Sequence, residues 1–447
     1  MKTGLLVVQK IKKYSLQFIE LFGEEKFIKV FLLAGFTAIV YSFAFFIASR
    51  AVDIPYLDQW SLADIITDKT HYNFWQLFFY QHNEHRIGVG LLIIKFLASF
   101  SNWSQLLEIK FISFLLIASA GLLTYAKYLA SQKLEWLDIF IPFLVLNIFQ
   151  VENLIWGFQI SFILPFFFLS LWLVAMLKIK STDWRYSILT IIAFLSSYSS
   201  FHGLFLPLIT IGLALFDYFK NQKERRVIMF AGLANILIIV SYFIGYVQDF
   251  QTKLSADALP ILKYFSTTLS GGFFYLRNDF VNYILLFVLL VFLVLAIYRI
   301  FKPGLNKNCL VGLVLIIFGV LFILTLALGR SSFGLTQGLS YRYITFSMLL
   351  PLGLFFVFAD FKKGWMFKMV LFAFMVGSFL MFSVWPIKWA NDQKVNGQRA
   401  LGCYTNIKQE DVGQCYKIAP LFPEEKFLDS KVVEVLRWKK INGFKNS

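Results

Sequence analysis

The chain has 447 residues, of which 58% are hydrophobic and only 15% are charged, and its mean hydropathy is +0.68. A soluble globular domain carries about 25% charged residues, so this composition excludes an ordinary soluble protein. The net charge of +16 is common in nucleic-acid-binding proteins, but most Lys and Arg residues here lie in short loops between apolar runs. Membrane topology accounts for that placement, and we expect no nucleic-acid partner.

Continuous apolar runs of roughly 15 to 22 residues recur along the chain and predict an all-α polytopic membrane protein. A closed β-barrel would need alternating segments of about 10 residues, which this sequence lacks. We expect about 11 transmembrane helices, over 27–49, 106–126, 137–150, 160–177, 186–200, 204–219, 227–247, 281–300, 310–329, 341–359 and 365–385.

The apolar segment 87–100 is short and is interrupted by Lys95. Positive charge concentrates in cytoplasmic loops, and the lysine-rich N-terminus therefore predicts a cytoplasmic start. The later basic loops share that side only if 87–100 lies flat on the outer face; these loops are 127–133, 178–185, 220–226, 299–307 and 361–368. We therefore expect 87–100 to be a flat juxtamembrane helix.

This topology divides the chain into a membrane bundle over 1–385, whose first outer loop is 50–105, and a small outer segment over 386–447. The outer face then holds 50–105, 151–159, 198–203, 248–280, 330–340 and the tail. Cys403 and Cys415 both fall in that tail, where an oxidising compartment permits a disulfide. Two free thiols are the alternative.

The first outer loop is the most polar segment that follows a predicted span. Asp58 stands in DIPYLDQW and is a candidate general base for an acceptor hydroxyl; a solvated or helix-capping Asp is the alternative. His82, Glu84, His85 and Arg86 lie in HNEHR. This run predicts a hydrogen-bonding turn that orders the site, a divalent-metal site at His82, Glu84 and His85, or a solvated face. We favour the turn, with no metal cofactor.

The other predicted outer loops each carry polar residues beside a span. Glu152 is a second candidate acid, and Gln159 follows it closely. His202 precedes Gly203 at a span entrance, where it could contact a phosphate oxygen or be a hydrogen-bonded structural histidine. Arg330 and Arg342 flank SSFGLTQGLS and could bind phosphate, or extend toward the membrane interface.

These motifs, in this order, resemble the GT-C glycosyltransferases, which use polyprenyl-phosphate sugars. Asp58 matches the family's acidic residue in the first outer loop, although Gln59 replaces a common second acid. Glu152 matches an acid after the third span, and His202-Gly203 matches a Lys-Gly motif with His in place of Lys. Arg342-Tyr343 matches an Arg-Tyr pair before a Leu- and Pro-rich stretch, and NEHR, WGFQ and RY together are similar to bacterial O-antigen glucosyltransferases.

The resemblance implies an enzyme that moves a hexose from a polyprenyl-phosphate donor to a lipid-linked or surface polysaccharide such as lipopolysaccharide. It implies a bacterial inner-membrane protein with its site and C-terminus on the periplasmic side. Asp58, Glu152 and Glu84 are the expected catalytic acids. The expected binding residues are His85, Arg86, Gln159, His202, Arg330, Arg342 and Tyr343. A non-catalytic flippase or transporter, or an O-antigen polymerase or ligase, is the alternative.

Overall fold

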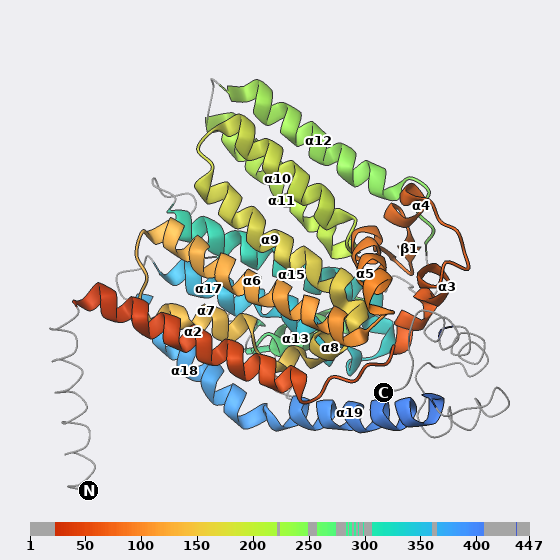
Figure 1. The fold of residues 1–447 in the computed structure, drawn as a ribbon. Helices are drawn as coiled ribbons and strands as arrows, with labels where there is room; N and C mark the ends of the chain where they lie inside the picture. Colours follow the sequence, from red (N-terminus) through yellow and green to blue (C-terminus); the bar gives the residue numbers. More distant parts are fainter. Residues whose placement is uncertain are drawn as a thin grey trace, which may run out of the picture.

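The computed structural model is a bundle of apolar helices that run side by side (Figure 1). The structure describes residues 23–220, 224–248, 257–273, 306–359 and 364–405, with isolated positions between 283 and 298 and at 435. Within this part of the chain, nine helical segments are long and apolar enough to cross a membrane: Glu24–Ala48, Gln105–Ser131, Trp136–Ile155, Gly157–Lys178, Phe201–Phe219, Arg225–Phe243, Lys307–Phe333, Tyr341–Phe358 and Gly364–Phe382. The predicted all-α polytopic membrane fold is confirmed at this level.

Two of the predicted spans are not among these nine segments. The span expected at 186–200 is occupied by α10 (Thr182–Ser197), a helix of 16 residues, which is short for a crossing. The span expected at 281–300 lies largely outside the described residues. The predicted total of about 11 spans therefore stays a prediction.

The individual elements of the first half are α2 (Glu24–Ala48), η1 (Leu57–Leu62), α3 (Ala63–Ile66), α4 (Phe74–Phe78), the two-stranded hairpin β1 (Gln81–His82) and β2 (His85–Arg86), α5 (Gly88–Ser101), α6 (Gln105–Ser131), η2 (Trp136–Ile139), α7 (Phe140–Val145), η3 (Ile148–Gln150), α8 (Val151–Ile155), η4 (Gly157–Gln159) and α9 (Ile160–Lys178). After α10 follow η5 (Phe201–Leu204), α11 (Phe205–Lys220), α12 (Arg225–Phe243), α13 (Ala258–Gly271), α15 (Lys307–Arg330), η7 (Ser331–Phe333), η8 (Gln337–Leu339), η9 (Tyr341–Tyr343), α16 (Ile344–Ser347), α17 (Leu349–Phe358), α18 (Gly364–Phe382) and α19 (Val384–Thr405).

The prediction of a loop over 151–159 was wrong. Helix α7 ends at Val145, and the chain then continues through η3 into α8 and η4. Asn147 starts η3 because its side chain accepts the backbone N–H of Phe149 at 2.9 Å. Buried Val151 and Leu154 hold α8 against the core. This segment is therefore a broken helix, and Glu152 is held on ordered backbone.

Close helix packing positions the C-terminal half of the bundle. Gly312 of α15 faces Gly353 of α17, and a Cβ atom built on Gly312 would lie 2.6 Å from the carbonyl oxygen of Gly353. Only glycine permits this approach, as is common between membrane helices. The contact fixes α15 against α17. Arg330 is the last residue of α15, and the segment that follows Arg330 leads into α17.

The predicted outer segments gather at one end of the bundle, beside α3, α4, α5 and α8 in Figure 1. Both ends of α5 lie there. The backbone N–H of Val89 donates to the carbonyl of Tyr198, at the end of α10, and Asp53, just after α2, accepts the backbone N–H of Gln105 at 2.6 Å. Helix α5 therefore returns to the end at which it begins, as expected for a helix that does not cross. Its flat position against a membrane stays a prediction.

The opposite end of the bundle is held by buried charge. Lys127 of α6 and Asp138 of η2 are 1% and 0% exposed, and their side chains lie 3.8 Å apart. Lys368 of α18, also 1% exposed, donates to Glu135. Each buried ammonium is thus opposed by a carboxylate, as burial requires. These ion pairs tie the ends of α6, η2 and α18 together.

Cysteine labelling can test the sidedness of α5. His71 lies before α5 and Ser99 lies in its last turn, and both are exposed. We expect His71→Cys and Ser99→Cys to react with a membrane-impermeant maleimide in intact cells. We expect Lys133→Cys, exposed at the opposite end of the bundle, to react only after permeabilisation. Reaction of residues 71 and 99 from opposite sides would mean that α5 crosses the membrane.

Candidate functional site

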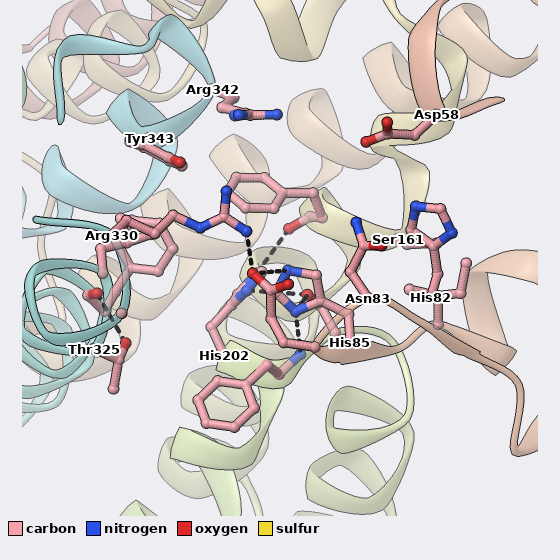
Figure 2. A pocket seen from close by; sticks show the side chains of 18 of the residues that line it. Asp58, His82, Asn83, His85, Ser161, His202, Thr325, Arg330, Arg342 and Tyr343 are labelled. Atoms are coloured by element: carbon pink, nitrogen blue, oxygen red, sulfur yellow. Dashed lines mark hydrogen bonds and ion pairs between the residues drawn. The ribbon is translucent and has the colours of Figure 1, made fainter. Parts of the chain in front are cut away.

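A cavity of about 500 Å³ opens at the end of the bundle where the predicted outer segments meet (Figure 2). Its walls come from η1, the β1–β2 hairpin, η4, the start of α9, η5, the end of α12, the end of α15 and η9. Cavities of this size and mixed lining are typical of ligand-binding sites. The predicted site residues that line it are Asp58, Glu84, His85, Gln159, His202, Arg330, Arg342 and Tyr343.

Arg86 does not line the cavity. Its side chain is 4% exposed, and its guanidinium donates to the carbonyl oxygens of Phe79, Tyr242 and Ile244. The backbone N–H of Arg86 also donates to the hydroxyl of Tyr242 at 3.0 Å. These bonds occupy the guanidinium and fasten the hairpin to the end of α12. The structure therefore gives Arg86 a structural position, and we remove it from the expected phosphate-binding set.

The hairpin turn presents Glu84 to the cavity. Asn83 adopts the left-handed backbone region with φ 49°, a conformation that Asn tolerates in tight turns. Glu84 accepts a hydrogen bond from Arg330, which arrives from the end of α15. The expected hydrogen-bonding turn is thus present, and Glu84 neutralises Arg330 inside the cavity.

Glu84 and His85 titrate as neighbours. Burial alone would raise the pKa of Glu84, but attraction to His85 and Arg330, with the hydrogen bond from Arg330, lowers it to about 2. Burial lowers the pKa of His85 to about 4, against the attraction of Glu84. The His85 ring is therefore neutral near pH 7. Its Nδ1 atom accepts the backbone N–H of Phe201, and its Nε2 atom lies 3.6 Å from Glu84.

The depressed pKa of His85 predicts a pH dependence of stability. The unfolded chain binds a proton near pH 6.5 and the folded chain only near pH 4, so stability should fall as the pH drops through that interval. Glu84 contributes its stabilisation above about pH 4.5 and loses it only as the pH falls toward 2, outside most of the window. We expect the melting temperature of the parent protein to fall more steeply between pH 6.5 and pH 4 than that of His85→Gln. His71→Asn, at an exposed histidine, is the control, and equal slopes in all three proteins would contradict the assignment.

Arg342 is held in the cavity by its own backbone. Its N–H donates to the carboxylate of Glu152 at 2.9 Å, and its carbonyl accepts from the amide of Asn153 at 2.8 Å. Ser340 also donates to Glu152. Glu152 does not line the cavity, so its observed position is that of a support for the η9 turn, and we no longer place it among the catalytic acids.

The side chain of Arg342 extends into the cavity and points toward Asp58 (Figure 2). Its Cζ atom lies 5.4 Å from the centre of the Tyr343 ring, and its Nε atom has no hydrogen-bond partner within the described residues. The Tyr343 hydroxyl is buried and lies close to the side chains of Arg342 and Tyr264. The η9 turn thus offers a guanidinium and a hydroxyl to an occupant of the cavity.

Asp58 enters from η1 on the opposite side. No described residue donates a hydrogen bond to its carboxylate, and only its backbone carbonyl has a partner, the hydroxyl of Ser61. The indole N–H of Trp156 donates to the carbonyl of Tyr56 at 2.8 Å, which fixes the chain two residues before Asp58. Asp58 and Arg342 are therefore opposite charges that face one cavity from separate, firmly held segments.

His202 lines the cavity, but both of its ring nitrogens have protein partners. The Nε2–H group donates to the carbonyl of Phe162 at 3.1 Å, and Nδ1 accepts from the hydroxyl of Ser200 at 3.1 Å. The rings of Phe322 and Phe346 contact the imidazole edge-on. These contacts match the structural alternative for His202, and they leave no ring nitrogen for a phosphate oxygen.

Gln159 differs from His202 in its hydrogen bonds to the protein. Its side chain is 3% exposed and lines the cavity, and its amide makes no hydrogen bond with another described residue. Sequence reasoning overlooked two neighbours on the same wall, Phe158 and Ser161. The WGFQ run contains the aromatic signal for Phe158, whereas nothing in the sequence distinguishes Ser161 from the other serines near span ends.

Two further expectations concern metal and disulfide sites. Among the described residues, no group of three His, Cys, Asp or Glu side chains could hold a metal ion, and this includes the trio considered in HNEHR. Cys403, near the end of α19, is disulfide-bonded, and Cys415, its predicted partner, lies outside the described residues.

Comparison of the chain with family models, curated proteins and solved structures found no match. What the protein does must therefore be argued from this cavity and from the bundle that surrounds it.

Proposed function

We propose that the protein is a membrane glycosyltransferase that moves a hexose from a polyprenyl-phosphate donor to a hydroxyl of a saccharide acceptor. The observation that carries the proposal is the pair of opposed charges, Asp58 and Arg342, in one cavity at the end of an apolar bundle. The other acid and the other guanidinium of the cavity, Glu84 and Arg330, neutralise each other. Among the described charged residues of the lining, Asp58 and Arg342 are thus the carboxylate and the guanidinium without an ion-pair partner.

A lipid-linked phosphate suits the wall formed by α15 and η9. Arg342 and Tyr343 offer a charge-assisted contact and a hydroxyl to a phosphate, and Arg is the residue that binds phosphate in a fork. The part of α15 that precedes Arg330 lines the cavity with the apolar side chains of Phe322, Leu326 and Leu328. A ligand with an anionic head and a hydrocarbon chain would match both parts of this wall.

The proposed reaction needs one base and no cofactor. Asp58 removes the proton of the acceptor hydroxyl, and the hydroxyl oxygen attacks the anomeric carbon of the hexose. The bond between that carbon and the phosphate oxygen breaks, and polyprenyl phosphate leaves with the electron pair and its negative charge stabilised by Arg342. A single displacement inverts the anomeric configuration.

We further propose that the cavity faces the periplasm from a bacterial inner membrane, with the N-terminus in the cytoplasm. The alternation of basic and neutral loops supports the orientation, and the resemblance supports the bacterial inner membrane. Acceptors on that side would be lipid-linked or surface polysaccharides, such as O-antigen or lipopolysaccharide, and the hexose would be glucose if the resemblance to glucosyltransferases holds.

The test is transfer by the full-length protein in lipid nanodiscs. Polyprenyl-phosphate glucose and other hexoses would be supplied with a lipid-linked saccharide acceptor, and the product's anomeric configuration read by NMR. We expect transfer with inversion from a polyprenyl-phosphate hexose and none from a nucleotide sugar. Movement of the lipid across a liposome membrane without any transfer would support a flippase and overturn the proposal. Joining of two lipid-linked saccharides would support a polymerase or ligase.

A further inference from the structure

The wall of the cavity opposite Arg330 and Tyr343 has a different chemical character. In Figure 2, Asp58, His82 and Asn83 lie on one side of the cavity, and Arg330 and Tyr343 lie on the other. Phe158 belongs to the side of Asp58 because its ring contacts His82, and Trp156 stacks on Phe158. Gln159 follows Phe158 in the chain and lines the same cavity. Apart from Asp58, this wall carries aromatic rings and neutral polar groups rather than fixed positive charge. The proposed phosphate wall therefore faces a surface that suits a neutral, polar ligand.

The aromatic part of this wall is rigid. The half-buried ring of Phe158 stacks on Trp156, with centroids 5.8 Å apart and an interplanar angle of 24°. The rings of His82 and Phe158 meet edge to face, with centroids 5.2 Å apart. A sugar ring has faces made of C–H groups, which pack on an aromatic surface, while its rim carries hydroxyls. An ordered ring at the wall of a polar cavity is a suitable platform for such a face.

Gln159 supplies the polar part. Its side chain lines the cavity and forms no hydrogen bond within the described residues, and its amide atoms keep access to the cavity, since they are not among the fully buried atoms that lack a partner. An amide offers two donor hydrogens and an acceptor oxygen. A vicinal pair of sugar hydroxyls could use both.

The platform is coupled to the proposed base. Trp156, on which Phe158 stacks, donates its indole N–H to the carbonyl of Tyr56, and Asp58 follows two residues later. A ligand that packs on Phe158 is therefore held at a defined distance and orientation from the Asp58 carboxylate. General-base catalysis requires that relation, because the hydroxyl must come within about 2.6–3.2 Å of the base.

We infer that the segment 156–159 is the subsite for the acceptor saccharide. A neutral sugar ring packs on Phe158, hydrogen-bonds to Gln159 and presents one hydroxyl to Asp58. This inference rests on the proposed function and names the place of its second substrate. The donor phosphate occupies the facing wall, so that the reacting hydroxyl and the anomeric carbon meet across the cavity.

Saturation-transfer NMR on the full-length protein in nanodiscs tests the subsite without any turnover. The probes are the methyl glycosides of glucose, galactose, mannose and rhamnose at millimolar concentration. We expect at least one glycoside to receive saturation from the parent protein, and to lose it in Phe158→Ala and Gln159→Ala. Phe158→Trp should keep the signal, because it keeps the aromatic face. Phe100→Ala, at an exposed position of α5 outside the cavity, is the matched control and should behave as the parent.

A second measurement separates acceptor from donor. Binding of fluorescent polyprenyl phosphate should be unchanged in Phe158→Ala and Gln159→Ala, and where transfer is observed these variants should raise the acceptor KM by about tenfold. If no glycoside receives saturation, or if the signal persists in both variants, the inference is wrong. A loss of polyprenyl-phosphate binding in both variants would place the donor on this wall and would also overturn it. Saccharide binding without transfer would refute only the proposed reaction.

Discussion

Asp58→Asn is expected to lower the rate of hexose transfer by about 10²-fold or more, the usual scale for loss of a general base. The amide keeps the shape of the carboxylate but cannot accept the proton of the acceptor hydroxyl. No described residue hydrogen-bonds to this carboxylate, so its replacement breaks no contact that holds η1 in place. The measurement is the initial rate of transfer in nanodiscs, together with the affinity for polyprenyl phosphate, which should stay within a few-fold of the parent.

Asp68→Asn is the matched control for this prediction. It makes the same chemical change in the same outer segment, but Asp68 is 62% exposed and pairs with Lys95 outside the cavity. We expect parental activity from it, since an exposed ion pair contributes little to stability. Near-normal turnover by Asp58→Asn would mean that the base is another group, and Glu84 would be the next candidate because it is the other carboxylate in the cavity lining.

The sequence is sufficient to predict the apolar bundle and the gathering of polar segments at one end. Both depend on hydropathy and on loop charge, which are local properties of the chain. The return of α5 to its starting end could also be predicted, because the basic loops fall on one side only if this short segment does not cross. The helix over 151–155 could not, since Glu152 and Asn153 are typical of a loop in the sequence, and the burial of Val151 and Leu154 that holds the helix is set by the fold.

The roles of the individual charged residues could be predicted only in part. Arg86, Arg330 and Arg342 look alike in the sequence, because each stands at the edge of an apolar segment. Only the fold brings three carbonyl oxygens to Arg86 and a carboxylate to Arg330. Glu152 and Asp58 differ in the same way, since one accepts hydrogen bonds from the η9 turn and the other from no described residue. Partners distant in sequence decide these roles.

Arg342→Ala is expected to weaken the binding of polyprenyl phosphate by about 10²-fold. A hydrogen bond to a charged group is worth about 1.5–3 kcal/mol, and each 1.4 kcal/mol is a tenfold change in affinity. The substitution should leave the backbone in place, because Glu152 and Asn153 hydrogen-bond to the backbone of residue 342 and not to its side chain. The η9 turn should therefore persist in the variant, and its melting temperature should stay close to that of the parent.

Arg330→Ala provides the decisive contrast. Arg330 already donates to Glu84 in the cavity, so its loss should cost polyprenyl-phosphate affinity less than the loss of Arg342. It should also lower the melting temperature, because Glu84 would lose its charge partner in a partly buried place. Arg342→Lys should lie between the parent and Arg342→Ala, since an ammonium keeps the charge but not the fork of donors. Equal loss of affinity in Arg330→Ala and Arg342→Ala would mean that the phosphate displaces Glu84 and is bound by both guanidinium groups.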